Sequence, residues 1–484
     1  MTIAAIDQGT TSTRALALAP DGTAAVVKAL EHRQIYPRPG WVEHDPEELV
    51  ANILACAEAV DGLEALGIDN QGESCLAWNA ETKEAVSPVI VWQDGRTSQV
   101  IDKLKRDGAE EATLARAGLP LDAYFSASKL AWIFEHSAAA RRLHAAGKLR
   151  LGTTDAFFLD RLTGRCVTDI TTASRTSLLD LAQGRWDSEL CRLFGVPLDA
   201  LPEIVPTTGD FGAMEVRGRR VPVVASIVDQ QAALYGHGCR DAGDAKITFG
   251  TGAFILMVTG PQLRRAPEQG LLPTVAWQLA GAAPVYALDG GVYSAGAAVN
   301  WARGLGLFDD IDSLNRLGGA AAVDRGLVFV PALSGLACPH WDRQARGTWA
   351  GLSIDHGAED LMKAILEGIA FRAAEVMRAM NALVPATGPL SIDGGLSRNP
   401  YFTGFLADAL YRELMIADSA ELTGSGTLQL TALACGRALQ AQPLGRSIRP
   451  GRSLGAQAST FAEAVAFSRV WNRRESIPGH PASA

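Results

Sequence analysis

The amino-acid sequence predicts an α/β protein built from two related halves. Apolar runs of strand length alternate with Ala- and Leu-rich helical patterns along most of the chain, which favours a mixed α/β architecture over an all-α or all-β fold. A strand–glycine turn–strand pattern at residues 4–18 (AAIDQGTTSTRALAL) returns at residues 245–260 (AKITFGTGAFILMVTG). The length of 484 residues allows two to three domains, at roughly 150 residues per domain.

Composition restricts the class of protein further. Hydrophobic residues make up 48% of the chain, and the net charge is -9 without any basic block, which argues against nucleic acid and anionic membranes as partners. The seven cysteines are scattered and form no C-x-x-C pair, so we expect reduced thiols. No apolar run reaches the roughly 18 residues of a membrane helix, and no basic leader precedes the first strand. These features predict a cytoplasmic protein.

The first element is a hairpin with a polar turn at residues 4–18. Backbone N–H groups in a glycine turn can point together at an anion, and an aspartate beside such a turn can hold a magnesium ion. On this interpretation Asp7 lies near Mg²⁺, and Thr10, Thr11 and Arg14 face nucleotide phosphates. The alternative is an ordinary tight hairpin, because glycine and threonine suit turns. The sequence has no G-x-x-x-x-G-K-[ST] P-loop, so that phosphate-binding fold is disfavoured.

The next elements carry polar and aromatic residues at the ends of predicted strands. The strand within residues 66–74 (LGIDNQGES) ends close to Glu73, the strand within residues 89–97 (VIVWQDGRT) ends at Trp92, and Tyr124 precedes a helix. Aromatic rings beside carboxylates and amides are typical of sugar and polyol sites. Each aromatic residue, taken alone, fits core packing better than a ligand site.

A strand at residues 224–228 ends at Asp229 and Gln230 and is followed by a helical pattern. An acid at the carboxyl end of a strand lies where open α/β sheets bind their ligands, and it could act as a general base toward a substrate hydroxyl. Aspartate is also a favoured helix N-cap. The sequence leaves both interpretations of Asp229 open.

The second half begins after the polar stretch RDAGD at residues 240–244. This loop-like stretch predicts a domain boundary, with a first domain of residues 1–240, a second of residues 241–470 and a tail of residues 471–484. A third glycine turn, DGGLSRN, follows a strand within residues 390–402 and opens a helix.

These motifs resemble those of the FGGY family of carbohydrate kinases and, within it, the glycerol kinases. The resemblance covers nearly the whole chain, and its most specific stretches are residues 124–136 (YFSASKLAWIFEH) and 347–367 (GTWAGLSIDHGAEDLMKAILE). It implies two RNase-H-like domains, similar to those of actin, hexokinase and the Hsp70 ATPase, which flank a nucleotide cleft. It also implies ATP-dependent phosphorylation of a small polyol or sugar, with Mg²⁺ as the metal ion. We also expect a homo-oligomer, either a dimer or a tetramer.

The resemblance also implies roles for individual residues. Asp229 would be the catalytic base, and Asp7 would lie at the metal ion. The implied nucleotide-binding residues are Thr10, Thr11, Ser12, Arg14, Gly250, Thr251, Gly395 and Asn399. The implied substrate-binding residues are Gly72, Glu73, Trp92, Tyr124, Gln230 and Phe254.

One position departs from the glycerol kinase pattern. Those enzymes carry an arginine directly before the glutamate, in N-Q-R-E-T, whereas this chain has Gly72 there and a second glycine, Gly95, where another arginine is usual. Hydrogen bonds to a charged group contribute roughly 1.5–3 kcal/mol, and glycine leaves room.

The sequence leaves three alternatives open. A longer acceptor, such as a pentulose or tetritol, could use the room. Arg96 could instead reach in from the neighbouring turn and keep glycerol as the acceptor, which remains the favoured compound. A non-kinase ATPase of the same superfamily is the third alternative, and the predicted polyol pocket argues against it.

Overall fold

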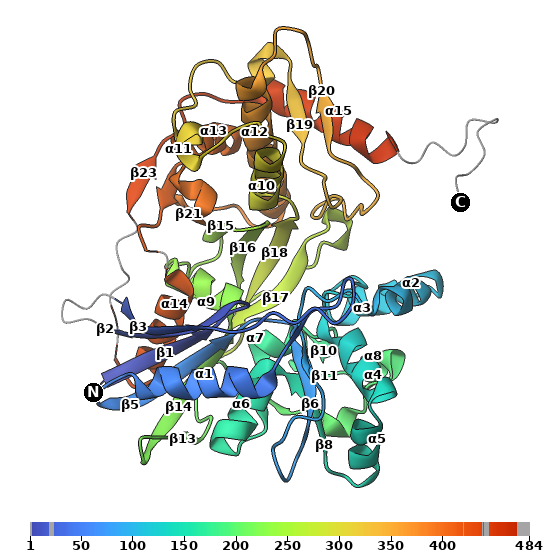
Figure 1. Ribbon diagram of the computed structural model, residues 1–484, viewed down its shortest axis with the longest axis vertical. Helices are drawn as coiled ribbons and strands as arrows, with labels where there is room; N and C mark the ends of the chain where they lie inside the picture. The colour runs from blue at the N-terminus through green and yellow to red at the C-terminus, as the bar shows by residue number, and fades with distance from the viewer. Residues whose placement is uncertain (1, 19–23, 420, 438, 440–444, 472–484) are drawn as a thin grey trace.

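The computed structural model describes residues 2–18, 24–419, 421–437, 439 and 445–471. The chain forms two halves, each built on a mixed β-sheet with helices on its faces (Figure 1). Of the predicted tail, only Trp471 is among the described residues. None of the described helices is both long and apolar enough to cross a membrane.

The first half contains a six-stranded sheet in the order β13-β14-β5-β1-β2-β3. β1 pairs antiparallel with β2 and parallel with β5, and β14 adds parallel to β5. The carboxyl ends of β1, β5 and β14 therefore meet at one edge of the sheet. The bounds are β1 (Thr2–Gln8), β2 (Ser12–Leu18), β3 (Ala24–Glu31), β5 (Leu63–Asn70), β13 (Ala213–Val216) and β14 (Arg219–Val228).

The second half repeats this arrangement in a seven-stranded sheet with the order β17-β18-β16-β15-β21-β22-β23. The hairpin β15–β16 corresponds to β1–β2, and the parallel neighbours β21 and β22 correspond to β5 and β14. The prediction of two related α/β halves is confirmed. The bounds are β15 (Ala245–Phe249), β16 (Ala253–Gly260), β17 (Leu272–Trp277), β18 (Val285–Val292), β21 (Leu390–Gly394), β22 (Leu414–Ile416) and β23 (Arg446–Ile448).

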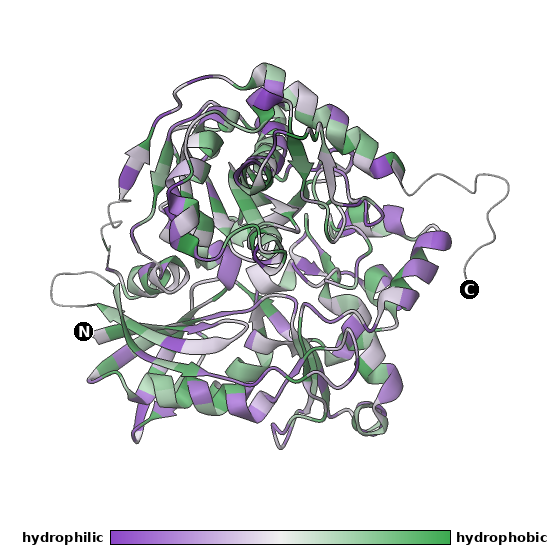
Figure 2. Ribbon diagram, turned by 45° about the horizontal axis from the view of Figure 1, so that its top comes forward, coloured by the Kyte–Doolittle hydropathy of each residue, from purple (hydrophilic) through white to green (hydrophobic). Residues whose placement is uncertain are grey.

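Helices cover both sheets, and a smaller sheet, β4-β7-β6-β8, extends the first half. Apolar residues gather in the strands and on the inner helix faces (Figure 2). The smaller sheet consists of β4 (Glu43–His44), β6 (Cys75–Asn79), β7 (Val89–Ile90) and β8 (Leu149–Thr153). The main helices are α1 (Pro46–Glu58), α4 (Ser126–His136), α6 (Thr154–Thr163), α7 (Ile170–Ala173), α9 (Asp229–Gly236), α10 (Gly296–Gly304), α12 (Ala358–Leu383), α13 (Pro400–Leu410), α14 (Leu422–Ala434) and α15 (Gly455–Val470).

Helix α14 comes late in the chain but packs against α9, β1 and β5 of the first half. Glycines allow this close approach. A Cβ atom at Gly236 would lie 1.9 Å from the carbonyl oxygen of Leu422, and one at Gly426 would lie 1.9 Å from that of Ala232. The two helix backbones are therefore in direct contact, and α14 supports the sheet edge where the site forms. The predicted limits at residues 240 and 470 stay predictions.

Candidate active site

The first polar turn lies between β1 and β2, as predicted. The N–H group of Gly9 donates to the carbonyl oxygen of Ser12 over 3.0 Å and closes the turn. Thr10 is half-buried, whereas Thr11 is exposed. The guanidinium of Arg14 forms an ion pair of 2.9 Å with Glu421, which directly precedes α14. Ser12 and Arg14 make these structural contacts, whereas Thr10 and Thr11 line a cavity between the halves.

Asp7 lies beside a second carboxylate that the sequence analysis missed. It pairs in register with Asp69 on the parallel strand β5, and Asp69 accepts a hydrogen bond of 2.7 Å from Thr427 of α14. Burial raises the pKa of Asp7, and burial together with the charge of Asp7 raises the pKa of Asp69 well above its ordinary value. The Oδ1 atom of Asp69 is buried and has no hydrogen-bond donor among the described residues. Two facing carboxyl groups fit a magnesium ion, which prefers oxygen ligands. Within the described ranges no group of three or more His, Cys, Asp and Glu side chains could hold a metal ion.

The second glycine turn lies between β15 and β16. The backbone N–H groups of Ala295 and Gly296 donate to the carbonyl oxygens of Thr251 and Gly250, each over 3.0 Å, so the N-terminus of α10 holds the turn in place. A cavity of about 470 Å³ opens beside it. The lining residues are Phe249, Gly250, Thr251, Gly296, Val299, Asn300, Ile311, Leu314, Asn315, Leu366, Gly395, Leu396, Arg398 and Asn399.

Four predicted nucleotide-binding residues thus line one cavity: Gly250, Thr251, Gly395 and Asn399. Both polar atoms of the Asn399 side chain bond to the protein backbone. Its Oδ1 accepts from the N–H of Phe402 at the start of α13, and its Nδ2 donates to the carbonyl oxygen of Leu314. Asn399 therefore shapes the wall of the cavity through its fold contacts.

All six predicted substrate-binding residues meet in a second cavity of about 120 Å³, between the two halves. Trp92 and Tyr124 pack edge to face, with ring centroids 5.6 Å apart. The backbone of Glu73 is left-handed, with φ at 60°, a conformation that costs about 1–3 kcal/mol for a residue other than glycine. The lining residues are Thr10, Gly72, Glu73, Trp92, Tyr124, Arg175, Val228, Asp229, Gln230, Gln231, Phe254, Leu256 and Asp289.

Arg175 is the guanidinium of this cavity, and sequence analysis missed it. It follows α7, donates from Nε to Glu73 over 2.7 Å and pairs from Nη2 with Asp289 of β18 over 3.1 Å. Glu73 and Asp289 together raise the pKa of Arg175, against the effect of burial. Arg175 lies in a polar stretch at residues 168–181, and only the fold brings it to Glu73.

The expectation that Arg96 restores the missing charge is wrong. Arg96 pairs with Asp94 and Glu43, both over 2.7 Å, and its guanidinium lies 3.8 Å from the centroid of the Trp41 ring. These contacts hold it outside the substrate cavity.

The expectation that Gly72 leaves room is also wrong. A Cβ atom at position 72 would lie 2.7 Å from Cγ2 of Val228, because Val228 already fills the space that the glycine opens. The cavity wall at this point is therefore apolar and closely packed.

Asp229 is the first residue of α9, and the N-cap position is occupied by Val228. Its Oδ1 accepts from the N–H of Gln230 over 2.7 Å. Burial and then the charge of Glu73 raise the pKa of Asp229 to about 7, while Lys246 lowers it. Lys246, buried on β15, donates from Nζ to Oε1 of Gln230 over 2.8 Å. A carboxyl group with this pKa can accept a proton near neutral pH.

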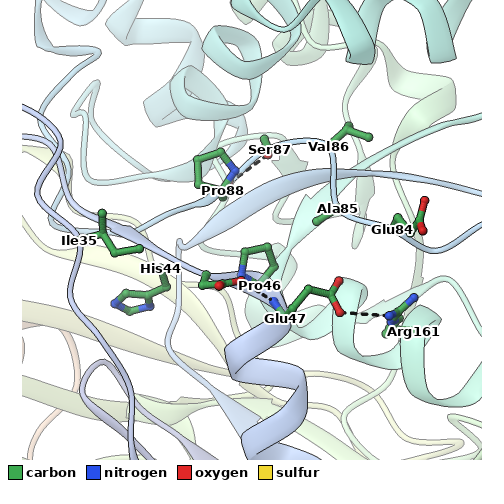
Figure 3. Close-up of a pocket in the computed structure, with 11 residues that line it drawn as sticks. Ile35, His44, Pro46, Glu47, Glu84, Ala85, Val86, Ser87, Pro88 and Arg161 are labelled. Atoms are coloured by element: carbon green, nitrogen blue, oxygen red, sulfur yellow. Dashed lines mark hydrogen bonds and ion pairs between the residues drawn. The ribbon is translucent and has the colours of Figure 1, made fainter.

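A third cavity of about 400 Å³ connects the other two. It shares Thr251 with the cavity beside α10. It shares Thr10, Trp92, Tyr124, Arg175, Phe254 and Asp289 with the substrate cavity. The shared lining residues place the three cavities next to one another, with Gly395 in the first and Asp229 in the last. Another hollow, of about 750 Å³, lies apart at the start of α1 beside Glu47 and Arg161, and none of the predicted site residues lines it (Figure 3).

Comparison with known proteins gives the family to which these features correspond. Residues 2–236 match the model of the N-terminal domain of the FGGY family of carbohydrate kinases, and residues 245–435 match that of its C-terminal domain. A glycerol kinase of Trichlorobacter lovleyi is 42% identical over 449 residues, and one of Haloferax volcanii is 38% identical over 458 residues, each covering 90% of both proteins. The structure of a Plasmodium falciparum glycerol kinase with ADP aligns with a TM-score of 0.90 at 27% identity, covering 96% of this chain and 98% of that one.

Proposed function

The chain belongs to the FGGY family of carbohydrate kinases, and we propose that glycerol is the acceptor that it phosphorylates. It is an ATP-dependent carbohydrate or polyol kinase, as the sequence analysis predicted. The likeness to enzymes named glycerol kinase along nine-tenths of the chain supports glycerol. The small volume of the substrate cavity, about 120 Å³, supports it as well, because drug-sized ligands occupy pockets of roughly 300–1,000 Å³.

The observation that carries the proposal is the position of Asp229 in this cavity, beside Glu73 and Gln230. With a pKa of about 7, a large fraction of Asp229 is ionised at neutral pH. The ionised carboxylate takes the proton from the attacking hydroxyl, while Glu73 and Gln230 hold the other hydroxyls. A positioned base of this kind contributes about 10²–10⁴-fold to the rate.

The phosphoryl group enters through the connecting cavity, whose lining includes Thr10 of the first half and Thr251 of the second half. Phosphoryl transfer needs positioning and charge stabilisation more than covalent chemistry. Enclosure between the halves excludes water, which competes with the acceptor. Thr11 adds a hydroxyl on the exposed side of the turn.

Mg²⁺ accompanies ATP in this proposal, and Asp7 and Asp69 would hold it. Their facing carboxyl groups offer oxygen ligands. When bound, the ion would neutralise charge on the phosphates.

A longer acceptor, such as a tetritol or pentulose, is the second candidate. The connecting cavity favours it, because about 400 Å³ of space opens directly from the substrate cavity. Its walls include the rings of Phe125, Tyr293 and Trp341, with Asp122 and Arg343 at a polar edge. Such a surface can hold the distal carbons and hydroxyls of a longer chain.

Coupled ADP release over a panel of three- to six-carbon polyols and ketoses tests both candidates. We expect acceptor-dependent ADP release with the highest kcat/KM for glycerol. A kcat/KM that is highest for a tetritol or pentulose selects the second candidate. ADP release that no acceptor stimulates contradicts both.

We also propose that the enzyme works in the cytoplasm as a homo-oligomer. All seven cysteines are free thiols, which suits a reducing compartment. Leu352 and Ile354, in the segment after β20 (Thr348–Ala350), are exposed, and exposed apolar side chains are candidates for a subunit contact. Size-exclusion chromatography with light scattering should give the mass of a dimer or tetramer, and a monomer mass contradicts the proposal.

A further inference from the structure

Six residues beneath the phosphate turn are joined in a closed ring by hydrogen bonds, four between side chains and two to the main chain of Thr10 and Trp92. They come from the β1–β2 turn, the segment after β3, β4, the end of β5 and the end of β7. The members are Thr10, Gln34, His44, Gln71, Ser74 and Trp92. None of the catalytic or binding roles proposed above involves Gln34, His44, Gln71 or Ser74.

One arc of the ring runs from Gln71 to the phosphate turn. Nε2 of Gln71 lies 3.2 Å from Nδ1 of His44, and Nε2 of His44 lies 3.0 Å from Oε1 of Gln34. Nε2 of Gln34 then donates to the carbonyl oxygen of Thr10 over 2.7 Å. His44 therefore joins two amide side chains by the opposite sides of its ring.

The other arc returns through the substrate cavity. The Ser74 hydroxyl donates to Oε1 of Gln71 over 3.2 Å and accepts from the backbone N–H of Trp92 over 3.1 Å. The indole N–H of Trp92 donates to the hydroxyl of Thr10 over 3.1 Å. The ring closes on Thr10, one of the residues that line the connecting cavity.

The ring has a single consistent direction of donation. Because the amide nitrogen of Gln34 donates to Thr10, its oxygen must accept, so His44 carries its proton on Nε2. The unprotonated Nδ1 then accepts from Gln71, whose oxygen accepts from Ser74. Each link fixes the next, and the ring requires a neutral His44. Burial supports this state, because it lowers the pKa of His44 to about 3.

We propose that His44 is a positioning residue for phosphoryl transfer, which ties the main chain at Thr10 to the main chain at Trp92 through the hydrogen-bond ring and so keeps their direct side-chain bond in place. The inference rests on the proposed roles of Thr10 at the phosphates and Trp92 at the acceptor. A fully satisfied buried network rigidifies the groups that it joins. A misplacement of about 1 Å between reacting groups can cost roughly 100-fold in rate, so His44 would affect the reaction although it lines none of the three cavities of the site.

Two substitutions of His44 separate hydrogen bonding from packing. His44→Leu removes both ring bonds, and we expect kcat to fall by roughly 10- to 100-fold. The rate of ATP hydrolysis by water should also rise relative to the rate of acceptor phosphorylation. His44→Gln can still accept on one side and donate on the other, so kcat should stay within about fivefold of the wild type. If kcat falls equally in His44→Leu and His44→Gln, the proposal is overturned.

Ser74→Ala provides a second test that leaves His44 in place. It opens the ring on the far side, so it should reproduce the kinetic pattern of His44→Leu. The double variant should be no slower than the slower single variant, because a ring is broken only once, whereas independent losses would multiply. If the kcat loss of the double variant equals the product of the two single losses, the proposal is overturned. Ser74→Ala also serves if His44→Leu does not fold.

Controls distinguish failure of this inference from failure of the proposed function. His136→Leu changes an exposed histidine of α4 and should leave the kinetics unchanged. Thr10→Val and Trp92→Phe test the assigned roles directly. If these two slow transfer while His44→Leu does not, the inference alone fails. If neither slows transfer, the proposed roles of Thr10 and Trp92 fail as well.

Discussion

At residue scale, the raised pKa of Asp229 comes from burial and from the charge of Glu73. Asp229→Asn keeps the shape of the side chain and removes the base. We expect kcat to fall by about 10²–10⁴-fold with nucleotide affinity largely unchanged, measured by steady-state kinetics and calorimetric titration with ADP. Asp61→Asn, at an exposed carboxylate, is the matched control. A variant that keeps more than about a tenth of wild-type kcat would remove Asp229 from the role of base.

The same pKa predicts how the rate depends on pH. Below about pH 7 Asp229 is protonated and cannot accept the hydroxyl proton, so kcat/KM for the acceptor should rise with pH through this value. Lys246 lowers the pKa of Asp229, and Lys246→Met should therefore move the midpoint to higher pH. Lys246→Met also frees Gln230, which should raise the acceptor KM. An unshifted midpoint in the pH–rate profile would contradict this coupling.

Val228 determines whether an arginine side chain fits at position 72. Since a Cβ atom there would lie 2.7 Å from Val228, Gly72→Arg alone should lower turnover of every acceptor. Val228→Gly in addition should admit the side chain, whose donors then favour glycerol over a longer acceptor by roughly 10- to 150-fold in kcat/KM. Val228→Gly alone is the control. If Gly72→Arg alone already favours glycerol, Val228 does not set the space.

At the scale of elements, the crossing of α9 and α14 depends on glycine. Gly426→Ala places a methyl group 1.9 Å from the carbonyl oxygen of Ala232 and should lower the free energy of unfolding by about 1–3 kcal/mol. Gly404→Ala in α13 meets no atom within 4 Å and should raise it by about 0.5–1 kcal/mol. Thermal unfolding should show a lower Tm for Gly426→Ala and a higher Tm for Gly404→Ala. Equal Tm shifts in the two variants would contradict the packing argument.

The sequence correctly predicted those short elements whose hydrophobic periodicity and turn residues lie within one stretch of the chain. The β1–β2 and β15–β16 hairpins and the strand that ends before Asp229 each carry their own periodicity and turn residues. The site residues that sequence analysis missed depend on distant contacts. Thr427 reaches Asp69 across 358 positions, and Arg175 reaches Glu73 across 102. No window of sequence contains both partners of such a pair.

At the scale of the whole molecule, the two halves meet through charged groups at the site itself. Arg175 joins Glu73 of the first half to Asp289 of the second, and Lys246 of the second half holds Gln230 of the first. These bridges surround the substrate cavity, so the separation of the halves and the shape of that cavity change together. An acceptor hydroxyl that bonds Glu73 also stabilises the arrangement of Arg175.

This coupling predicts that ligands on both sides of the cleft close it further. ATP and acceptor together should give a smaller radius of gyration than either ligand alone, because only the pair engages both halves at Thr10 and Thr251. The Asp229→Asn variant allows this measurement with ATP itself, since transfer is blocked while binding remains. Small-angle scattering of that variant, with each ligand and with both, provides the comparison. An equal radius of gyration in all of these states would mean that the cavities are already enclosed before ligands bind, and that water is excluded without motion of the halves.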